Sequence, residues 1–254
     1  MTAVCKPRFL NGNALKIIAA IAMVIDHVGL LFFPFDMTFR IIGRISFPLF
    51  AFLLAEGCKY THNKIKHFLL LLGLTIICQL VYSVLMEDDY LCVLVTLCLG
   101  QLNVFALQYL KKTGFNKEKK IADKIFAVIP LLCTVILTFA IDFFFHVEYG
   151  FWGAMLPAVT SIFDFKNIDV TDKLKKLDNH YVRLLCFAVG MILMTIFSRS
   201  SLPKEYAFVA IFPLLFYNER RGKYKLKYFF YLFYPLHLVL LEGLYLLLYI
   251  ISIS

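Results

Sequence analysis

The sequence predicts an all-α, polytopic integral membrane protein. Of its 254 residues, 61% are hydrophobic and only 17% are charged, and the mean hydropathy is +0.79. A soluble domain of this length needs a far more polar surface to cover its core. Several apolar runs also reach the length of about 20 residues that a helix needs to cross a bilayer. Little sequence remains between these runs, so we expect a single domain over residues 1–254.

About nine apolar segments are expected to enter the membrane and to surround a polar cavity. They cover residues 14–35, 39–57, 66–86, 90–110, 124–146, 149–164, 182–199, 205–218 and 228–252. The segments 149–164 and 205–218 are short, and tilted, re-entrant or partly buried helices are alternatives there.

Charge is distributed unevenly between the two sides of these predicted spans. When the connections alternate between inside and outside, most of the 26 Lys and Arg residues fall on one side. The other side holds Arg199 and Lys204, together with the acidic run Glu87, Asp88 and Asp89. The positive-inside rule then places the N-terminus in the cytoplasm and, with an odd number of spans, the C-terminus outside. This sidedness, rather than nucleic-acid binding, explains the net charge of +9.

The cysteines and the N-terminus predict neither a metal site nor a cleaved leader. The seven cysteines form no C-x-x-C motif, and most lie in apolar runs, where core packing is expected. Lys16, Asp26 and His27 interrupt the first apolar run, so we interpret it as a helix of the mature protein rather than as a signal peptide.

Ionisable residues within the first two apolar segments are the main functional signal. They are Lys16, Asp26, His27, Arg40, Arg44 and Glu56. An ionisable group at membrane depth usually faces a cavity and is a functional candidate. Lys16 and His27 are eleven residues apart, close to three helical turns, and therefore share one face. Pro48 is expected to kink the second segment.

The last apolar segment adds a second group of polar residues, Tyr234, His237 and Glu242. Counting about 1.5 Å of rise per residue places His27, Arg44 and His237 at similar depth on three separate spans. A histidine there can be a general base, a nucleophile or a proton relay. We therefore expect one intramembrane site built from sequence-distant helices.

Three stretches resemble the TraX family, which is named for the pilin N-acetylating protein of conjugation systems. They are LKIIAAIAMVIDHVG from Leu15, FRIIGRISFPLFAFLLAEG from Phe39, and YNERRGKYKLKYFFYLFYPLHLVLL from Tyr217. The stretch EYGFWG from Glu148 is similar to a D-Y-G-containing segment of that family, with glutamate where aspartate is usual.

The resemblance implies membership of the wider transmembrane acyltransferase superfamily. That superfamily includes the heparan-sulfate glucosaminide N-acetyltransferase and membrane O-acetylases. It implies acetyl-CoA as a cytoplasmic co-substrate and an acceptor reached from the other side of a bacterial inner membrane. His27 matches the essential histidine of the first helix, Lys16 matches the residue eleven positions earlier, and Arg44 matches the arginine of the second helix.

We therefore expect a membrane acetyltransferase that acts on an amine or a hydroxyl, with no metal. The candidate catalytic residues are His27, Asp26, Arg44 and His237. The candidate donor-binding residues are Lys16, Arg40, Glu56, Tyr234, Arg220 and Arg221. In this hypothesis the first histidine is base or acyl carrier, with Asp26 or Glu56 orienting it, and cations stabilise negative charge.

Two other classes remain open from the sequence. A proton-coupled transporter would use His27, Asp26, Glu56 and His237 as a relay. An assembly or scaffold subunit would need no chemistry, and a homo-oligomer is compatible with each class. The acceptor and the acyl chain length stay unassigned.

Overall fold

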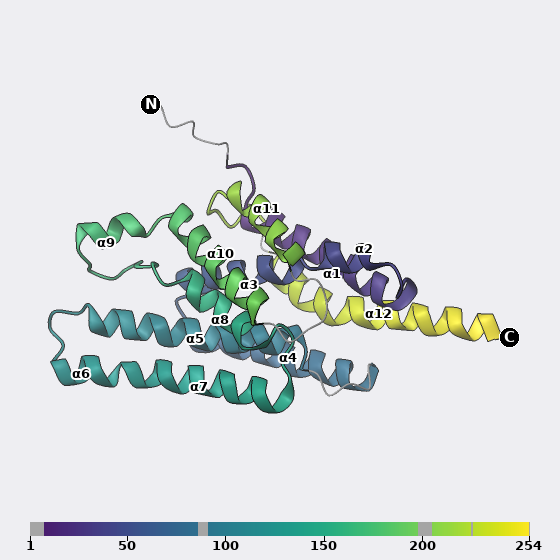
Figure 1. The fold of residues 1–254 in the computed structure, drawn as a ribbon, viewed down its shortest axis with the longest axis horizontal. Coiled ribbons are helices and arrows are strands. Elements are labelled where there is room, and N and C mark those ends of the chain that lie inside the picture. Colours follow the sequence, from purple (N-terminus) through teal and green to yellow (C-terminus); the bar gives the residue numbers. More distant parts are fainter. Residues whose placement is uncertain (1–7, 86–90, 198–204, 225, 254) are drawn as a thin grey trace. The chain divides into compact units, whose positions relative to one another are not determined.

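The computed structural model describes residues 8–85, 91–197, 205–224 and 226–253, and every regular element within these ranges is a helix (Figure 1). The elements are α1 (Gly12–Phe32), α2 (Met37–Gly43), α3 (Ser46–Tyr60), α4 (Lys64–Leu85), α5 (Val93–Gly114), α6 (Ile121–Phe126), α7 (Val128–Phe145), α8 (Gly150–Thr160), α9 (Asp172–Leu177), α10 (His180–Ile196), the 3₁₀ helix η1 (Glu205–Ala210), α11 (Ile211–Leu215) and α12 (Lys227–Ile253). For the described residues, the all-α prediction is confirmed.

Six helical stretches in the described part of the chain are long and apolar enough to cross a membrane. They are Gly12–Phe32, Met37–Tyr60, Lys64–Ser83, Val93–Gly114, Ile121–Phe145 and Phe229–Ser252. The protein is therefore a multi-pass membrane protein. The other three predicted spans, 149–164, 182–199 and 205–218, correspond to the shorter helices α8, α10 and η1–α11. The acidic run from Glu87 to Asp89, Arg199 and Lys204 lie outside the described residues.

The chain divides into two compact units. The first comprises Met1–Phe50, Leu80–Met86 and Leu202–Ser254, and the second comprises Ala51–Gln79 and Glu87–Ser201. Both units are therefore assembled from segments that are far apart in the sequence.

In the first unit, α1 and α2 form a tightly packed hairpin. Asp36 caps α2 by accepting a hydrogen bond from the Thr38 backbone at 2.9 Å, and hydrogen bonds from Thr38 hold the pKa of Asp36 below its usual value. A methyl group at Gly29 would collide with Phe39, and one at Gly43 would collide with Asp26. The two helices thus approach as closely as they do only because glycine has no side chain.

The predicted second span is interrupted before Pro48, and not at it. Helix α2 ends at Gly43, Arg44 and Ile45 form a turn, and α3 restarts at Ser46. Pro48 cannot donate a hydrogen bond to the carbonyl four residues earlier, on Arg44, and its ring also crowds that group. As the third residue of α3, proline loses nothing, because the first turn of a helix has no internal acceptor for its N–H groups.

The beginning of α1 is held by the segment that precedes α12. The backbone N–H groups of Gly12 and Asn13 donate to the carbonyls of Arg220 and Arg221 at 2.8 and 3.1 Å. The Asn13 side chain donates to Tyr224 O at 2.8 Å. The first and last membrane helices are therefore tied together at this end.

In the second unit, α8 packs between α5 and α10. A Cβ at Gly100 of α5 would lie 2.9 Å from the Ala154 carbonyl, so the α5 and α8 backbones are close together. Leu91, just before α5, forms a bridge with Val147, and Lys111 in the last turn of α5 donates to Ser161 O at 2.7 Å. Residues 147–161 therefore run beside α5 along nearly its whole length.

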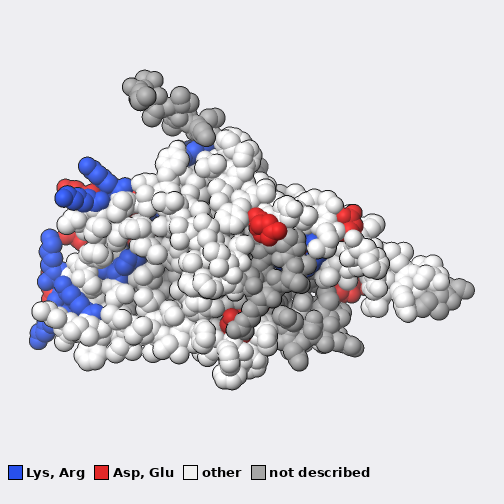
Figure 2. Space-filling model, viewed as in Figure 1, with Lys and Arg blue, Asp and Glu red and all other residues white. Residues whose placement is uncertain are grey.

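Lysines gather at one end of the second unit. The α5–α6 connection and α9 carry exposed lysines there, seen as the blue groups in Figure 2. They are Lys117, Lys119, Lys120, Lys173, Lys175 and Lys176. This clustering agrees with the charge pattern behind the positive-inside prediction, which itself remains a prediction.

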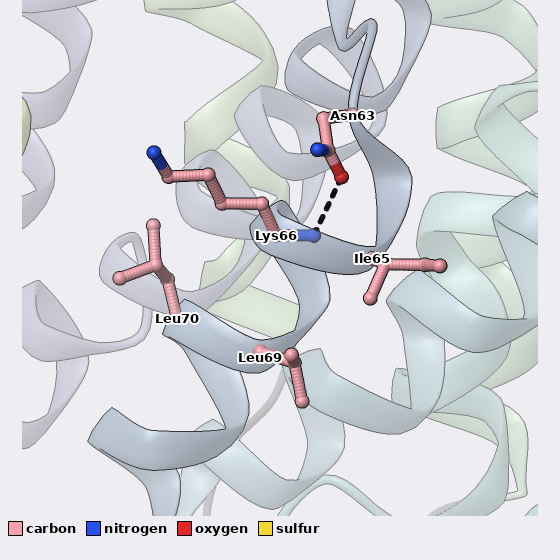
Figure 3. A pocket seen from close by; sticks show the side chains of 5 residues that line it. All are labelled: Asn63, Ile65, Lys66, Leu69 and Leu70. Carbon is pink, nitrogen blue, oxygen red and sulfur yellow. Dashed lines mark hydrogen bonds between the residues drawn. The ribbon is translucent and has the colours of Figure 1, made fainter.

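A pocket of about 430 Å³ lies at the beginning of α4 (Figure 3). It is lined by Asn63, Ile65, Lys66, Leu69 and Leu70. None of the candidate site residues lines it, so this pocket is not the polar cavity that the sequence predicts.

Candidate active site

Every candidate site residue except Glu56 lies in the first unit. They come from α1, the α2–α3 region, the segment before α12, and α12 itself. The sequence-distant helices expected to build one site are therefore found in one compact unit.

His27 on α1 is held in a single tautomer. Its Nδ1 lies 2.8 Å from the backbone carbonyl of Met23. A carbonyl can only accept, so Nδ1 carries the proton and Nε2 keeps its lone pair. The prediction that Asp26 or Glu56 orients this ring is wrong for Nδ1, because a carbonyl one turn earlier in the same helix takes that place.

His237 on α12 repeats the same arrangement. Its Nδ1 lies 3.0 Å from the carbonyl of Phe233, so it too has an Nε2 lone pair. The side chain is buried, and none of the described residues hydrogen-bonds its Nε2. The ring centroids of His27 and His237 are 5.1 Å apart, with the rings at 85°. The two histidines singled out from the sequence therefore form a direct pair.

Aromatic side chains hold the His237 ring in place. Phe233 stacks on it at 5.1 Å between centroids with only 9° between the planes, and Tyr234 meets it edge-on at 5.5 Å. Tyr234 is also buried. This packing fixes the direction of the Nε2 lone pair of His237 through ring contacts and not through a carboxylate.

Asp26 serves the arginines of the second segment and not its neighbour His27. Arg40 Nη1 donates to Asp26 Oδ2 at 2.8 Å, and Arg44 Nη2 lies 3.8 Å from Oδ1. Arg44 is buried, with 3% of its surface exposed. Both guanidinium groups therefore lie beside one carboxylate at this point of α1.

Three of the candidate donor-binding residues, Lys16, Arg220 and Arg221, lie near the beginning of α1, whereas Arg40, Tyr234 and Glu56 do not. Lys16 Nζ is 5.8 Å from the centroid of the Phe230 ring, which connects α1 to α12 again. Arg220 and Arg221 are exposed, and their carbonyls hold the beginning of α1. Three cations thus lie on the two segments that meet there.

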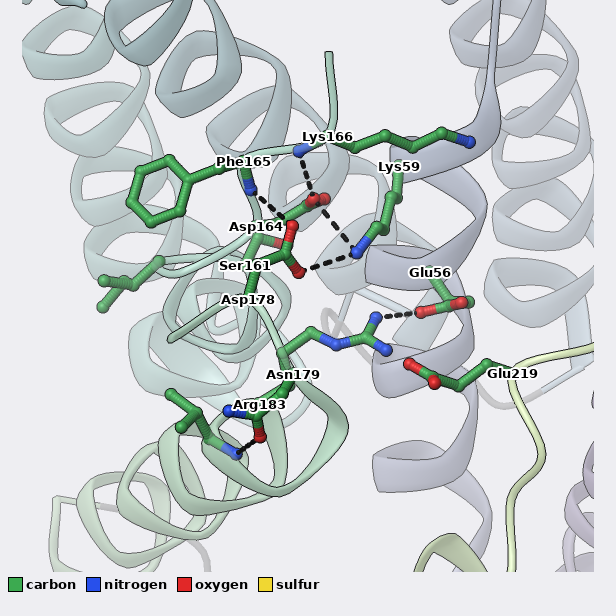
Figure 4. Close-up of polar contacts among 12 residues, drawn as sticks. Glu56, Lys59, Ser161, Asp164, Phe165, Lys166, Asp178, Asn179, Arg183 and Glu219 are labelled. Atoms are coloured by element: carbon green, nitrogen blue, oxygen red, sulfur yellow. Dashed lines mark hydrogen bonds and ion pairs between the residues drawn. The ribbon is translucent and has the colours of Figure 1, made fainter. Parts of the chain in front are cut away.

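Glu56 belongs to a separate, buried ion-pair network in the second unit (Figure 4). It pairs with Arg183 of α10. One turn further along α3, Lys59 Nζ lies 2.9 Å from Asp178 and 3.3 Å from Asp164. Glu56 is therefore the partner of a buried cation, and this pairing joins α3 to α10.

The contacts that the sequence reasoning missed are mostly made by backbone carbonyls. Met23 and Phe233 each lie four residues before a histidine, which is the spacing at which a side chain can reach the preceding turn. The four-residue spacing could therefore have pointed to both carbonyls from the sequence. No comparable signal exists for the partner of Glu56, because Arg183 lies in a distant helix and resembles a cytoplasmic boundary residue.

Comparison with known proteins finds relatives over most of the chain. The family model described as TraX protein matches residues 11–245. A probable fimbrial assembly protein FimC, serogroup H1, of Dichelobacter nodosus is 28% identical over 248 residues, covering 89% of this chain and 92% of the relative. An uncharacterized protein of Rickettsia prowazekii is 36% identical over 95 residues, covering 37% of this chain and 36% of that protein. No solved structure matches.

The family match covers every candidate site residue. It extends from the cap of α1, through the two arginines and the ion-pair network, into α12 beyond His237. This chain is therefore a member of the TraX family.

Proposed function

We propose that this membrane protein is an acyltransferase of the bacterial inner membrane, which moves acetyl from cytoplasmic acetyl-CoA to an amine, or to a hydroxyl, of an extracytoplasmic acceptor. The single observation that carries the proposal is the His27 tautomer. Because Nδ1–H donates to the Met23 carbonyl, the Nε2 atom of His27 carries a lone pair within the membrane-spanning helix α1. Acyl transfer from a thioester needs such a nitrogen as base or as nucleophile.

Positive charge close to this helix supports the same chemistry. A thioester carbonyl under attack develops negative charge on oxygen, which fixed cations stabilise in a dry site. Arg40 and Arg44 place two guanidinium groups beside Asp26 on this helix. We assign the two guanidinium groups, with the hydroxyl of the buried Tyr234, to this role.

The donor half of the proposal uses the cations at the other end of α1. The phosphates of CoA require cationic partners, and no phosphate-binding glycine loop occurs in the sequence. Lys16, Arg220 and Arg221 are the groups that we assign to them. Because Arg220 and Arg221 are fixed through their carbonyls, their side chains are available for an anion.

The acceptor is proposed from the relatives. The Dichelobacter relative is named as a probable fimbrial assembly protein, and the resemblance of this sequence to the TraX family implies a protein that acetylates pilin. We therefore propose an amino group of a pilus subunit as the acceptor class.

The test measures both binding and chemistry in the full-length protein in detergent. CoA and acetyl-CoA are expected to raise the apparent melting temperature of the wild type, and acetyl-CoA to release free CoA thiol. His27→Ala is expected to lose thiol release by about 100-fold or more, while His62→Ala, at an exposed position, keeps it. Full activity in folded His27→Ala would refute the assignment. Proton flux in vesicles that is independent of CoA would favour a transporter.

A further inference from the structure

His27 and His237 have the same tautomer, although a reaction with one general base needs only one such histidine. Both rings donate Nδ1–H to the carbonyl four residues earlier, and both keep Nε2 as the reactive atom. They come from separate helices, α1 and α12, and meet edge-on with 5.1 Å between the ring centroids. A buried acceptor such as His237 Nε2 is unfavourable unless a donor reaches it at some stage of function.

The locked tautomer also limits what His27 can do. If its Nε2 takes the acetyl group, its Nδ1 is already committed to the Met23 carbonyl. No nitrogen of His27 is then left to receive the proton of the attacking amine. Asp26 is engaged by Arg40 and Arg44, whereas His237 brings an Nε2 lone pair on a ring whose centroid lies 5.1 Å from that of His27.

We propose that the two histidines divide the reaction: His27 Nε2 carries the acetyl group, and His237 Nε2 is the general base for the acceptor. This inference rests on the proposed acetyltransferase function and assigns a different step of it to each ring. The Phe233 and Tyr234 rings, which pack against His237, keep its lone pair directed while the acceptor reacts.

In the first step, the Nε2 lone pair of His27 attacks the thioester carbonyl of acetyl-CoA. The new C–N bond forms, the C–S bond breaks, and the sulfur leaves as a thiolate. Because Nδ1 keeps its proton, the acetylated ring is a cation, which is readily attacked. The positive ring and the negative thiolate balance.

In the second step, the amine nitrogen of the acceptor attacks the acetyl carbon, and His237 Nε2 takes the amine proton. The bond between the acetyl carbon and His27 breaks, and its electron pair returns to Nε2. The proton then passes from His237 to the CoA thiolate. The sum is acetyl-CoA plus amine giving amide plus CoA thiol.

Asparagine is the matched replacement for either histidine. Its side-chain amide places an N–H close to the position of Nδ1, so it can still donate to the helix carbonyl, but it has no counterpart of the Nε2 lone pair. Folding is checked by the apparent melting temperature, and the donor site by stabilisation with CoA. His27→Asn and His237→Asn are therefore expected to fold and to bind CoA as the wild type does.

The experiment follows CoA release from radiolabelled acetyl-CoA on a rapid time scale, with water, octylamine or hydroxylamine as the nucleophile. His27→Asn is expected to show neither an initial burst of thiol nor exchange of label into added CoA. His237→Asn is expected to keep the burst and the exchange, but to turn over about 100-fold more slowly with water or octylamine. Hydroxylamine should restore its turnover, because this weakly basic nucleophile loses its proton to water without a catalyst.

The outcomes separate this inference from the function on which it rests. Wild-type turnover without burst or exchange means direct transfer, which overturns the division of roles and leaves the acetyltransferase standing. A folded His237→Asn that loses the burst, or that turns over at the wild-type rate, also overturns it. If the wild type releases no thiol with any of the three nucleophiles, the proposed function itself fails.

Discussion

Asp26 and His27 are neighbours in the chain, yet their side chains serve different partners. One hundred degrees of helical rotation separates consecutive residues, so Asp26 faces α2 while His27 faces α12. The ion pairing of Asp26 with two arginines and the presentation of a reactive imidazole by His27 therefore occur in the same turn of one helix. The glycine opposite Asp26 makes the first of these possible.

Gly43→Ala is predicted to disturb the contact between α2 and Asp26 of α1 directly. The added methyl group would overlap the Asp26 carboxylate, so α2 must move or the ion pair must break. We expect a loss of about 1–3 kcal/mol in the free energy of unfolding, seen as a lower apparent melting temperature, together with reduced thiol release.

Gly73→Ala in α4 is the matched control, because a methyl group there meets no atom of the described residues within 4 Å. It is expected to stabilise by about 0.5–1 kcal/mol through helix propensity. Equal effects of the two substitutions would contradict the collision argument.

At the scale of elements, the end of the short helix α8 is capped by a side chain from another helix. The helix ends at Thr160, and the carbonyls that follow have no further turn to satisfy them. Lys111 of α5 donates to Ser161 O at 2.7 Å and to Asp164 O at 2.6 Å, so its ammonium replaces that turn. The same contacts fix the register of α8 along α5.

Lys111→Met is predicted to destabilise the second unit. Methionine keeps the apolar stem but leaves buried carbonyls without their donor, which costs about 1–3 kcal/mol for each group left unsatisfied. Lys112→Met removes the same charge at an exposed neighbouring position and should change the melting temperature little. A Lys111→Met protein as stable as Lys112→Met would show that the carbonyls find other donors.

At the scale of the whole molecule, the number of crossings decides where the chain ends. Six crossings return the C-terminus to the side of the N-terminus, whereas an odd number places it opposite. The register between Val147 and Ser161 carries α8 and its flanks past nearly all of α5, although α8 itself has only 11 residues. The odd count of crossings and the outside C-terminus therefore stay predictions.

Single introduced cysteines test this sidedness in intact cells with a membrane-impermeant maleimide. Phe35→Cys, between α1 and α2, and Ser252→Cys, near the end of α12, are expected to react from outside. Lys117→Cys, between α5 and α6, is expected to react only after permeabilisation. The wild type, with its own cysteines, sets the background. Reaction of Ser252→Cys only after permeabilisation would establish an even number of crossings.

The sequence by itself determined the class of protein, most of its helices and the residues worth testing. Hydropathy and helical rise are local properties, so they identify the long spans and bring His27 and His237 to a common depth. They left the short segments such as 149–164 undecided, and they placed the helix break at Pro48 instead of at Arg44.

Only the tertiary structure decided which partners the buried charges take. Asp26 pairs with Arg40 and Arg44, and Glu56 pairs with Arg183, because these pairs depend on which helices are adjacent and on how closely glycines let them approach. The histidine tautomers follow from both levels: the carbonyl is local, four residues away, but the free nitrogen matters only because α12 brings a second ring to it. A buried polar group must find a partner wherever packing offers one, and packing is not written in any single stretch of the chain.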